Sequence, residues 1–248
     1  MARLSGEAIR VTGLSKSYAD WPVLWDLELT VGWGEFLVLF GANGAGKTTL
    51  LRILSTAARP DQGNVYVAGY NARRQSESIR RHLGVVGHKH LLYEDLTAGE
   101  NLLFYGRLFQ ISNLKERVEQ VLSQVGLQGR IDHRFRNLSH GMQKRLSIAR
   151  AILHQPDILL LDEPETGLDR ESVSMLNNLL AQWTASGRSV VMTTHNIELG
   201  LAWADRVALL STGKIDFQEQ KDNLDPVGLK EILAPSLRVA AAGQGVHQ

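Results

Sequence analysis

Residues 41–48 read GANGAGKT, and this glycine-rich run constrains the fold more than any other part of the sequence. The run fits the pattern G-x-x-x-x-G-K-[ST]. It follows a β-type apolar segment at 36–40 and precedes a helical pattern with apolar residues at 50, 51, 53 and 54. A strand, a glycine turn and a helix in this order predict a loop that binds phosphate through backbone N–H groups and the helix N-terminus.

The loop and the start of the helix supply the candidate ligands of a nucleoside triphosphate. Glycines let backbone N–H groups converge on phosphate oxygens without Cβ clashes. The lysine would contact the β- and γ-phosphates, and the threonine after it would hold Mg²⁺. The candidate ATP-binding residues here are Gly41, Asn43, Gly44, Ala45, Gly46, Lys47, Thr48 and Thr49.

A second element, ILLLDEP at 158–164, is an aliphatic run that ends in two acids. An all-aliphatic strand is typical of the centre of a parallel sheet, and ligands bind at the carboxyl ends of such strands. We expect Asp162 to hold Mg²⁺ and Glu163 to act as the general base for an attacking water. Taken alone, the acidic pair could instead cap a helix; the phosphate loop favours the nucleotide role.

The order of the segments predicts an α/β fold with a helical insertion. A mostly helical pattern runs from about 76 to 153, between β-type segments. We expect one domain over 1–220, with a helical subdomain inserted at about 90–155, and a C-terminal extension over 221–248 whose end has little to bury. The β-type segments are 9–11, 27–31, 36–40, 65–68, 158–161, 189–194 and 206–211.

Composition narrows the range of partners. The 248 residues carry a net charge of +1, so no strong field draws the chain to nucleic acid, and no nucleic-acid partner is expected. There is no cysteine, which excludes disulfides and fits a reducing compartment. The longest apolar runs fall far short of the roughly 20 residues that span a bilayer. If the chain drives transport, another chain supplies the membrane pathway.

Four further motifs give the sequence a family resemblance. LSHGMQKR at 138–145 resembles the ABC signature, TGLD at 166–169 resembles the D-loop, and VVMTTHN at 190–196 resembles the switch strand. Residues 14–35 look like the opening segment of the same family. The chain therefore resembles ABC-type ATPases from about residue 8 to 220. A guanine-reading N-K-x-D motif is missing, which argues against a GTPase.

The resemblance implies a P-loop NTPase fold with an N-terminal antiparallel β subdomain, a mostly parallel core sheet and an inserted α-helical subdomain. It also implies hydrolysis of ATP with Mg²⁺, and a homodimer in which two chains sandwich two ATP molecules head to tail. The partner would be a membrane-spanning permease subunit. The chain would then lie peripherally at the cytoplasmic face of the inner membrane.

The resemblance also implies roles for individual residues within one chain. Tyr18 would stack on adenine, with Trp21 and Trp25 as alternatives, or it could be a core aromatic. His195 would bond the γ-phosphate and position water; the alternative is a strand-end histidine satisfied by solvent.

Three residues would act across the dimer interface. Ser139 and the backbone at Gly141 would reach the γ-phosphate bound by the partner, because a helix start offers N–H and O–H donors to an anion. Asp169 would help order the partner's site. Ser139 and Asp169 could instead serve as ordinary helix caps, and both roles can hold at once.

Departures from the family pattern concentrate in three places. His140 and Met142 stand in the signature where glycine and glutamine are commonest, and Glu165 lies just after the acidic pair. The loop glutamine that usually senses magnesium is replaced by His88, followed by Lys89. A neutral imidazole is a poor match for the oxygen-rich shell of Mg²⁺, although a water-bridged role is open.

Residues 85–108 (VVGHKHLLYEDLTAGENLLFYGRL) resemble exporter ATPases of the heme-export, cytochrome c biogenesis type. ATPases of multidrug, lipid and polysaccharide exporters share much of this segment. A soluble ABC ATPase acting on DNA or ribosomes is less favoured, because the chain has one cassette and no long heptad stretch. Residues 90–93 are expected to dock a helix of the membrane subunit, or else to pack inside the helical subdomain.

Overall fold

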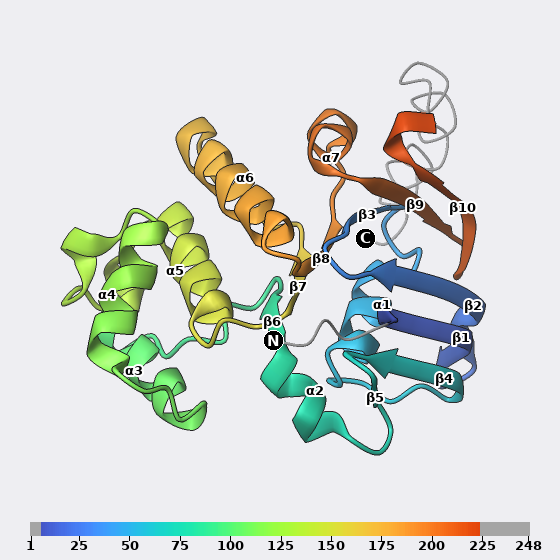
Figure 1. The fold of residues 1–248 in the computed structure, drawn as a ribbon, viewed down its shortest axis with the longest axis horizontal. Helices are drawn as coiled ribbons and strands as arrows, with labels where there is room; N and C mark the ends of the chain where they lie inside the picture. Colours follow the sequence, from blue (N-terminus) through green and yellow to red (C-terminus); the bar gives the residue numbers. More distant parts are fainter. Residues whose placement is uncertain (1–5, 224–248) are drawn as a thin grey trace, which may run out of the picture.

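The computed structural model describes residues 6–223, and its N-terminal part is an antiparallel sheet in the order β2-β1-β4-β5. Burial alternates along the two long strands, so one face of this sheet packs on the core. Figure 1 shows this sheet at the side of the molecule away from α3, α4 and α5. The strands are β1 (Glu7–Tyr18), β2 (Trp21–Gly32), β4 (Gln62–Val67) and β5 (Tyr70–Asn71).

The second sheet has six strands in the order β10-β9-β3-β8-β7-β6. Only the β10–β9 pair is antiparallel; the other neighbours are parallel. The central strands are buried at every position, as their aliphatic sequences predict. The strands are β3 (Phe36–Phe40), β6 (Leu83–Val86), β7 (Ile158–Asp162), β8 (Ser189–Thr193), β9 (Arg206–Ser211) and β10 (Lys214–Gln220).

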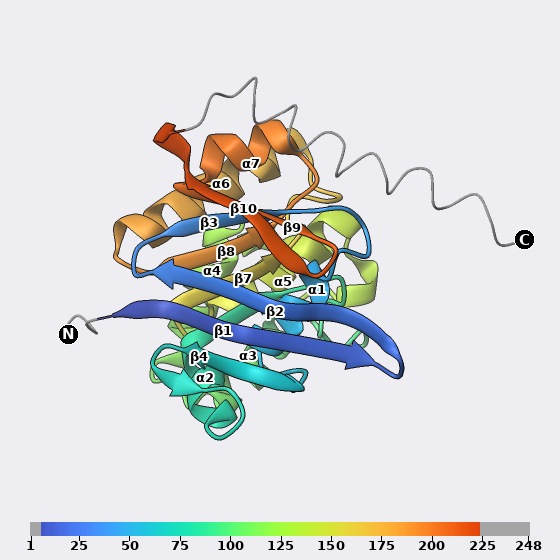
Figure 2. The same ribbon diagram turned by 90° about the vertical axis from the view of Figure 1, so that its right-hand side faces the viewer.

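Helix α1 (Lys47–Leu54) shares a hydrophobic core with both sheets, because its buried leucines and isoleucine pack with residues of β1, β2, β3 and β7. Figure 2 shows β2 running beside β10, so the two sheets meet at that edge. A second core holds the remaining face of the parallel sheet against α6 (Arg170–Ala185) and α5 (His140–Ile152).

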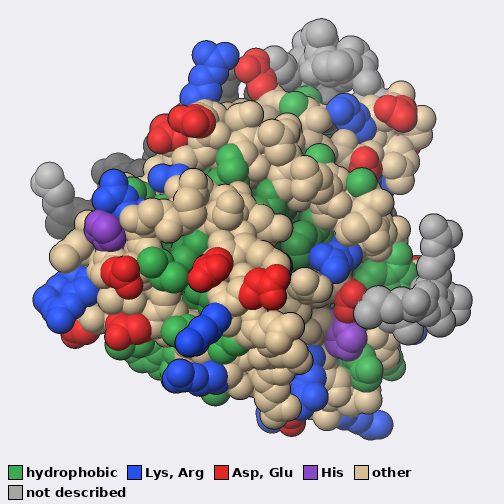
Figure 3. Space-filling model, turned by 60° about the vertical axis from the view of Figure 1, so that its left-hand side comes forward, with side chains coloured by type: hydrophobic (Ala, Val, Ile, Leu, Met, Phe, Trp, Pro, Cys, Tyr) green, Lys and Arg blue, Asp and Glu red, His purple; other side chains and the backbone are tan. Residues whose placement is uncertain are grey.

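The helical group α3 (Ala98–Leu108), α4 (Leu114–Gln124) and α5 forms a lobe at one end of the molecule (Figure 1). A capping box, in which Thr97 and Glu100 exchange hydrogen bonds, fixes the start of α3. On the face that brings this lobe forward, hydrophobic side chains form small groups among charged ones (Figure 3). The remaining α-helices of residues 6–223 are the short α2 (Ser76–His82) and α7 (Ile197–Trp203). Three 3-10 helices are also present: η1 (Gln128–Arg130), η2 (Phe135–Asn137) and η3 (Lys221–Asn223).

The expected fold class is confirmed, but three strands, β5, β6 and β10, lie outside the β-type segments that the sequence predicted. The region 76–153 was expected to be mostly helical, yet it contains β6, which pairs in parallel with β7. Four residues, LGVV, directly after a helix carry too short a pattern to distinguish strand from helix. None of the helices between residues 6 and 223 is long and apolar enough to cross a membrane. Of the C-terminal extension expected over 221–248, residues 224–248 lie outside the described residues.

Candidate functional site

The glycine-rich loop joins the carboxyl end of β3 to α1, as predicted. Gly44 and Gly46 have φ angles of 80° and 108°, in the left-handed region that favours glycine. A Cβ at Gly46 would lie 2.6 Å from Leu24 Cδ2 and 3.1 Å from the Val23 carbonyl. Gly46 is also the N-cap of α1, so the free N–H groups at the helix start face the loop.

Lys47 is the cation of this loop. Its side chain is 6% exposed, and Nζ donates to the carbonyls of Gly41 at 2.6 Å and Ala42 at 2.9 Å. An ammonium group has three N–H donors, so a third remains for a phosphate oxygen. Burial lowers the pKa of Lys47, while the charges of Glu163 and Asp162 oppose that shift.

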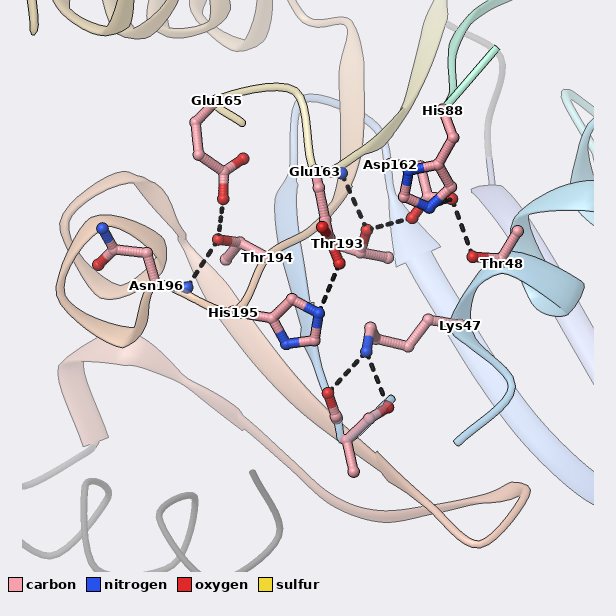
Figure 4. A network of polar contacts seen from close by, with 12 residues as sticks. Lys47, Thr48, His88, Asp162, Glu163, Glu165, Thr193, Thr194, His195 and Asn196 are labelled. Atoms are coloured by element: carbon pink, nitrogen blue, oxygen red, sulfur yellow. Dashed lines mark hydrogen bonds and ion pairs between the residues drawn. The ribbon is translucent and has the colours of Figure 1, made fainter. Parts of the chain in front are cut away.

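The carboxylate of Asp162, at the end of β7, is held in place by hydrogen bonds from neighbouring side chains (Figure 4). Thr48 Oγ1 donates to Asp162 Oδ2 at 2.9 Å, and Thr193 Oγ1 donates to Oδ1 at 2.6 Å. His88 Nε2 lies 3.3 Å from the same Oδ2. A hydroxyl and a carboxylate side by side are hard oxygen donors of the kind Mg²⁺ takes with phosphate oxygens and water. Thr48 and Asp162 therefore fit as the protein's magnesium ligands.

Glu163 is the next residue along the chain, and its backbone is unusual. Its φ of 48° is left-handed for a residue other than glycine, a conformation that the surroundings must hold. Glu163 N donates to the carbonyl and to Oγ1 of Thr193, both at 3.2 Å. The side chain reaches His195, with 2.6 Å between Oε1 and Nε2 (Figure 4). The carboxylate and the imidazole are thus in direct contact, and they form an ion pair when the histidine is protonated.

The phosphate loop, Glu163 and His195 surround a cavity of about 630 Å³, a size typical of small-molecule sites. The phosphate loop forms one wall, and the acid–histidine pair forms another. The Glu163 carboxylate could therefore activate a water molecule opposite a phosphate chain bound by the loop, which is the chemistry of phosphoanhydride hydrolysis. The cavity is lined by Val23, Ala42, Asn43, Gly44, Gly46, Lys47, Thr48, Thr49, His88, Glu163 and His195.

Comparison with known proteins places this geometry in a family. Residues 24–166 match the family model described as ABC transporter. The chain is 33% identical over 202 residues to the ABC transporter ATP-binding protein NatA of Bacillus subtilis (strain 168), covering 80% of this chain and 82% of that protein. The chain belongs to the ABC transporter family. Within that family it is an ATP-binding subunit, which hydrolyses ATP with Mg²⁺.

Other relatives agree with this assignment. Nod factor export ATP-binding protein I of Rhizobium sp. (strain N33) is 37% identical over 213 residues, which cover 85% of this chain and 70% of that protein. The dimeric ATP-binding cassette MJ0796, solved in a post-hydrolysis state with ADP and Pi, superposes with a TM-score of 0.81 at 27% identity. That match covers 87% of this chain and 100% of the chain in the solved structure.

The signature and D-loop residues of this ABC cassette do not line the cavity. Ser139 and Asp169 are the N-caps of α5 and α6; their side chains accept from Met142 N at 3.3 Å and Ser172 N at 2.7 Å. Gly141 faces the D-loop, where its Cβ would lie 3.3 Å from the carbonyl of Gly167. The capping roles are therefore present, and the roles across a dimer interface stay predictions.

The three aromatic residues considered for adenine stacking do not line the cavity, and they differ in their own contacts. Tyr18 is 41% and Trp21 78% exposed where β1 and β2 meet. Trp25 is held by the β9–β10 turn, since its Nε1 donates to Thr212 O at 3.1 Å and Lys214 Nζ lies 3.8 Å from its ring centroid. Stacking by Tyr18 stays a prediction. Of the sensor-loop pair, His88 lines the cavity and Lys89 is exposed outside its lining.

Sequence reasoning missed several residues that hold the site. Thr193 bonds both Asp162 and the Glu163 backbone, and Lys144 of α5 donates from Nζ to the Glu163 carbonyl at 3.1 Å. Thr194 and Glu165 are hydrogen-bonded to each other beside the switch histidine. The paired threonines directly before His195 were the one visible signal, because hydroxyls at a strand end commonly bond nearby polar groups.

Proposed function

We propose that the chain is the ATPase subunit of an ABC exporter, working as a nucleotide-sandwich homodimer on a membrane-spanning permease subunit. One observation carries this proposal: Lys47, Glu163 and His195 line one cavity, while Ser139 lies at a separate helix start. Asp162 is joined to that cavity through its hydrogen bond with Thr48. A helix N-terminus with a hydroxyl suits an anion, and a second copy's ATP would bring one there. The structural relative MJ0796 is described as a dimer.

In this proposal each ATP is held by two chains. One chain supplies Tyr18, the phosphate loop and Glu163, and the other supplies Ser139 and the Gly141 backbone, with Asp169 at the interface. The cassette would comprise residues 1–220, with its helical subdomain at about 90–155. It would lie peripherally at the cytoplasmic face of the inner membrane, since its work is done on the permease.

The purified chain is expected to be mainly monomeric without nucleotide and dimeric with ATP, because ATP itself would form much of the interface. Light scattering at low protein concentration, with and without ATP and Mg²⁺, measures this. Hydrolysis would disperse the wild-type dimer, so the ATP arm uses a slowly hydrolysed analogue in parallel. A dimer that persists at low concentration without any nucleotide would contradict the proposal.

The cargo is a finer part of the proposal. The resemblance of residues 85–108 to heme-export ATPases supports heme export with cytochrome c maturation. A second candidate, an exporter of another cargo, is supported by relatives named for Nod factor export and, at 33% identity, for daunorubicin resistance in Streptomyces coeruleorubidus. Reconstitution with the permease subunit, and comparison of heme with amphiphilic drugs as stimulators of ATPase activity, separates the two.

The contact with the permease would use part of the segment 90–93. Leu91 and Tyr93 are 55% and 52% exposed, so they are available to a partner. Leu92 packs against the main core, and His90 bonds Ser147 Oγ at 2.8 Å. The expected four-residue docking cluster is therefore divided: two side chains point outward and two pack inside the helical subdomain.

Leu91→Asp combined with Tyr93→Ala is expected to leave basal ATPase activity of the isolated subunit within about threefold of wild type, since neither residue lines the cavity. Removing two exposed apolar side chains should strongly reduce co-purification with the permease and abolish transport. The matched control is Leu108→Asp, an equally apolar residue that is 63% exposed on α3. Pull-down yield and thermal transition are measured for each variant; wild-type yield for the double variant would place the docking site elsewhere.

A further inference from the structure

Helix α5 runs beside the segment 163–167, which carries the catalytic glutamate at one end and the D-loop glycine at the other. At the D-loop end, a Cβ at Gly167 would lie 2.6 Å from His140 Cδ2, so the first residue of α5 packs directly on that glycine. One turn further along α5, Lys144 Nζ donates to the Glu163 carbonyl at 3.1 Å. The first turns of α5 therefore touch both ends of this segment.

The side chain of Lys144 is buried where it makes this contact. Its side chain is 5% exposed, and a buried ammonium group needs compensating charge. Burial lowers the pKa of Lys144, and three carboxylates oppose that shift, with Glu165 the strongest of them, then Asp162 and Glu163. Of these three acidic residues, Glu165 opposes the shift most, and Lys144 itself holds the backbone of the catalytic glutamate.

Glu165 acts on the other side of the catalytic pair. Its Oε1 accepts a hydrogen bond from Thr194 Oγ1, and the same Thr194 oxygen accepts from Asn196 N at 3.0 Å. His195 lies between Thr194 and Asn196 in the chain, so these bonds hold the backbone on both sides of it (Figure 4). The second oxygen, Oε2, is buried and has no hydrogen-bond partner within residues 6–223. Burial raises the pKa of Glu165, while the Thr194 bond and the charge of Lys144 lower it.

We propose that Lys144 and Glu165 are two positioning residues, of which Lys144 fixes the backbone of Glu163 and Glu165 fixes the segment that bears His195. Together they set the geometry of the contact between the Glu163 carboxylate and the His195 imidazole. Neither side chain lines the nucleotide cavity, so the pair acts through Glu163 and His195 and not on ATP.

The same contacts connect two ATP sites. Helix α5 begins with Ser139 and Gly141, which the proposed function assigns to the ATP held by the partner copy; this step rests on that proposal. Lys144 joins the same helix to the base that serves the chain's own ATP. A shift of α5 on engaging the partner's phosphate would therefore move Glu163, and the two sites would hydrolyse in a coupled way.

A matched pair of double variants separates positioning from folding. In a Glu165→Gln background, which removes the counter-charge and keeps an acceptor for Thr194, Lys144 is changed either to Gln or to Met. The two replacements have similar length and volume, and only Gln can donate to the Glu163 carbonyl. Both variants have a neutral pair, so neither leaves an uncompensated buried charge.

The expected result is a kcat about 10–10²-fold lower for the Met variant than for the Gln variant, as for a misplaced catalytic group, with KM for ATP equal within about twofold. Their thermal transitions should coincide. The Hill coefficient for ATP should fall toward one in the Met variant, because α5 no longer reaches Glu163. Equal kcat values and equal Hill coefficients in the two variants would overturn the proposal and leave the pair as a stabilising contact.

Two further measurements keep the outcomes distinct. ATP-dependent dimer formation, measured with Glu163→Gln added to each variant, tests the nucleotide-sandwich dimer itself. If the Glu163→Gln parent forms no dimer with ATP, the proposed function is overturned. If dimers form normally and the Gln and Met variants have equal kcat values, only the positioning role is overturned. If both Lys144 variants fail to fold, Glu165→Gln alone decides. A fall in kcat of about tenfold at unchanged KM and thermal transition supports positioning, and a wild-type kcat rejects it.

Discussion

Lys47→Ala is expected to abolish ATP binding at ordinary nucleotide concentrations. The ammonium is held 2.6 Å and 2.9 Å from two loop carbonyls, which point its remaining donor toward the phosphates. Each charge-assisted hydrogen bond to phosphate contributes about 1.5–3 kcal/mol, so losing contacts to both the β- and γ-phosphates weakens binding by roughly 10²-fold or more. Isothermal titration calorimetry with ATP and Mg²⁺ measures the loss.

The control for this variant is Lys115→Ala, which removes an exposed lysine of α4 and should bind ATP normally. The Lys47 variant must also keep its thermal transition, because it removes a donor from the Gly41 and Ala42 carbonyls, of which Ala42 keeps only its bond from Ala45 N. Near-normal affinity in a folded Lys47→Ala protein would mean that the loop backbone alone holds the phosphates, and the role given to the lysine would be wrong.

The elements that could be predicted from the sequence are those whose chemistry is local. The strand, glycine turn and helix around Lys47 lie in one short stretch, and Asp162 ends a strand that could only be central in a parallel sheet. Their meeting at one edge follows from the rule that ligands bind at the carboxyl ends of parallel strands. The contact between Thr48 and Asp162, 114 residues apart in the chain, confirms that expectation.

What the sequence could not supply depends on long-range packing. Lys144 sits in a helical pattern where a lysine is typical of a solvated surface, yet the docking of α5 on the end of β7 buries it. The four residues of β6 read equally as the end of a helix, and only their pairing with β7 makes them a strand. Glu165 was visible as a departure from the family pattern, but its partner Thr194 lies 29 residues further on.

The position of His88 shows how a departure can be partly resolved. The structure places its imidazole in the cavity, 3.3 Å from the carboxylate that would hold Mg²⁺, where the family pattern has glutamine. Imidazole nitrogen is a weaker match for Mg²⁺ than an amide oxygen. A contact through a metal-bound water fits this geometry, because the ring is 59% exposed and reaches the site from the open side.

Glu163→Gln is expected to leave ATP affinity unchanged and to slow hydrolysis by about 10²–10⁴-fold, the usual contribution of a positioned general base. Glutamine keeps the shape of glutamate, and its amide can still bond His195, which lies 2.6 Å from the present carboxylate oxygen. Only the ability to take a proton from water is lost. Single-turnover hydrolysis and equilibrium ATP binding, measured on the same preparation, separate the two effects. Glu171→Gln, an exposed glutamate in the first turn of α6, is the charge-matched control.

The same variant tests whether hydrolysis opens the dimer. If the sandwich is held by ATP and released when the phosphoanhydride is cleaved, Glu163→Gln should accumulate as an ATP-bound dimer, while the wild type passes through it only briefly. Light scattering with ATP and Mg²⁺ then reports twice the monomer mass for the variant. A variant that stays monomeric yet binds ATP would show that nucleotide binding and dimer formation are separate events. A variant that hydrolyses ATP at the wild-type rate would show that a group other than Glu163 activates water. The next candidate would be His195, because within residues 6–223 it is the only titratable side chain that forms an ion pair with the Glu163 carboxylate.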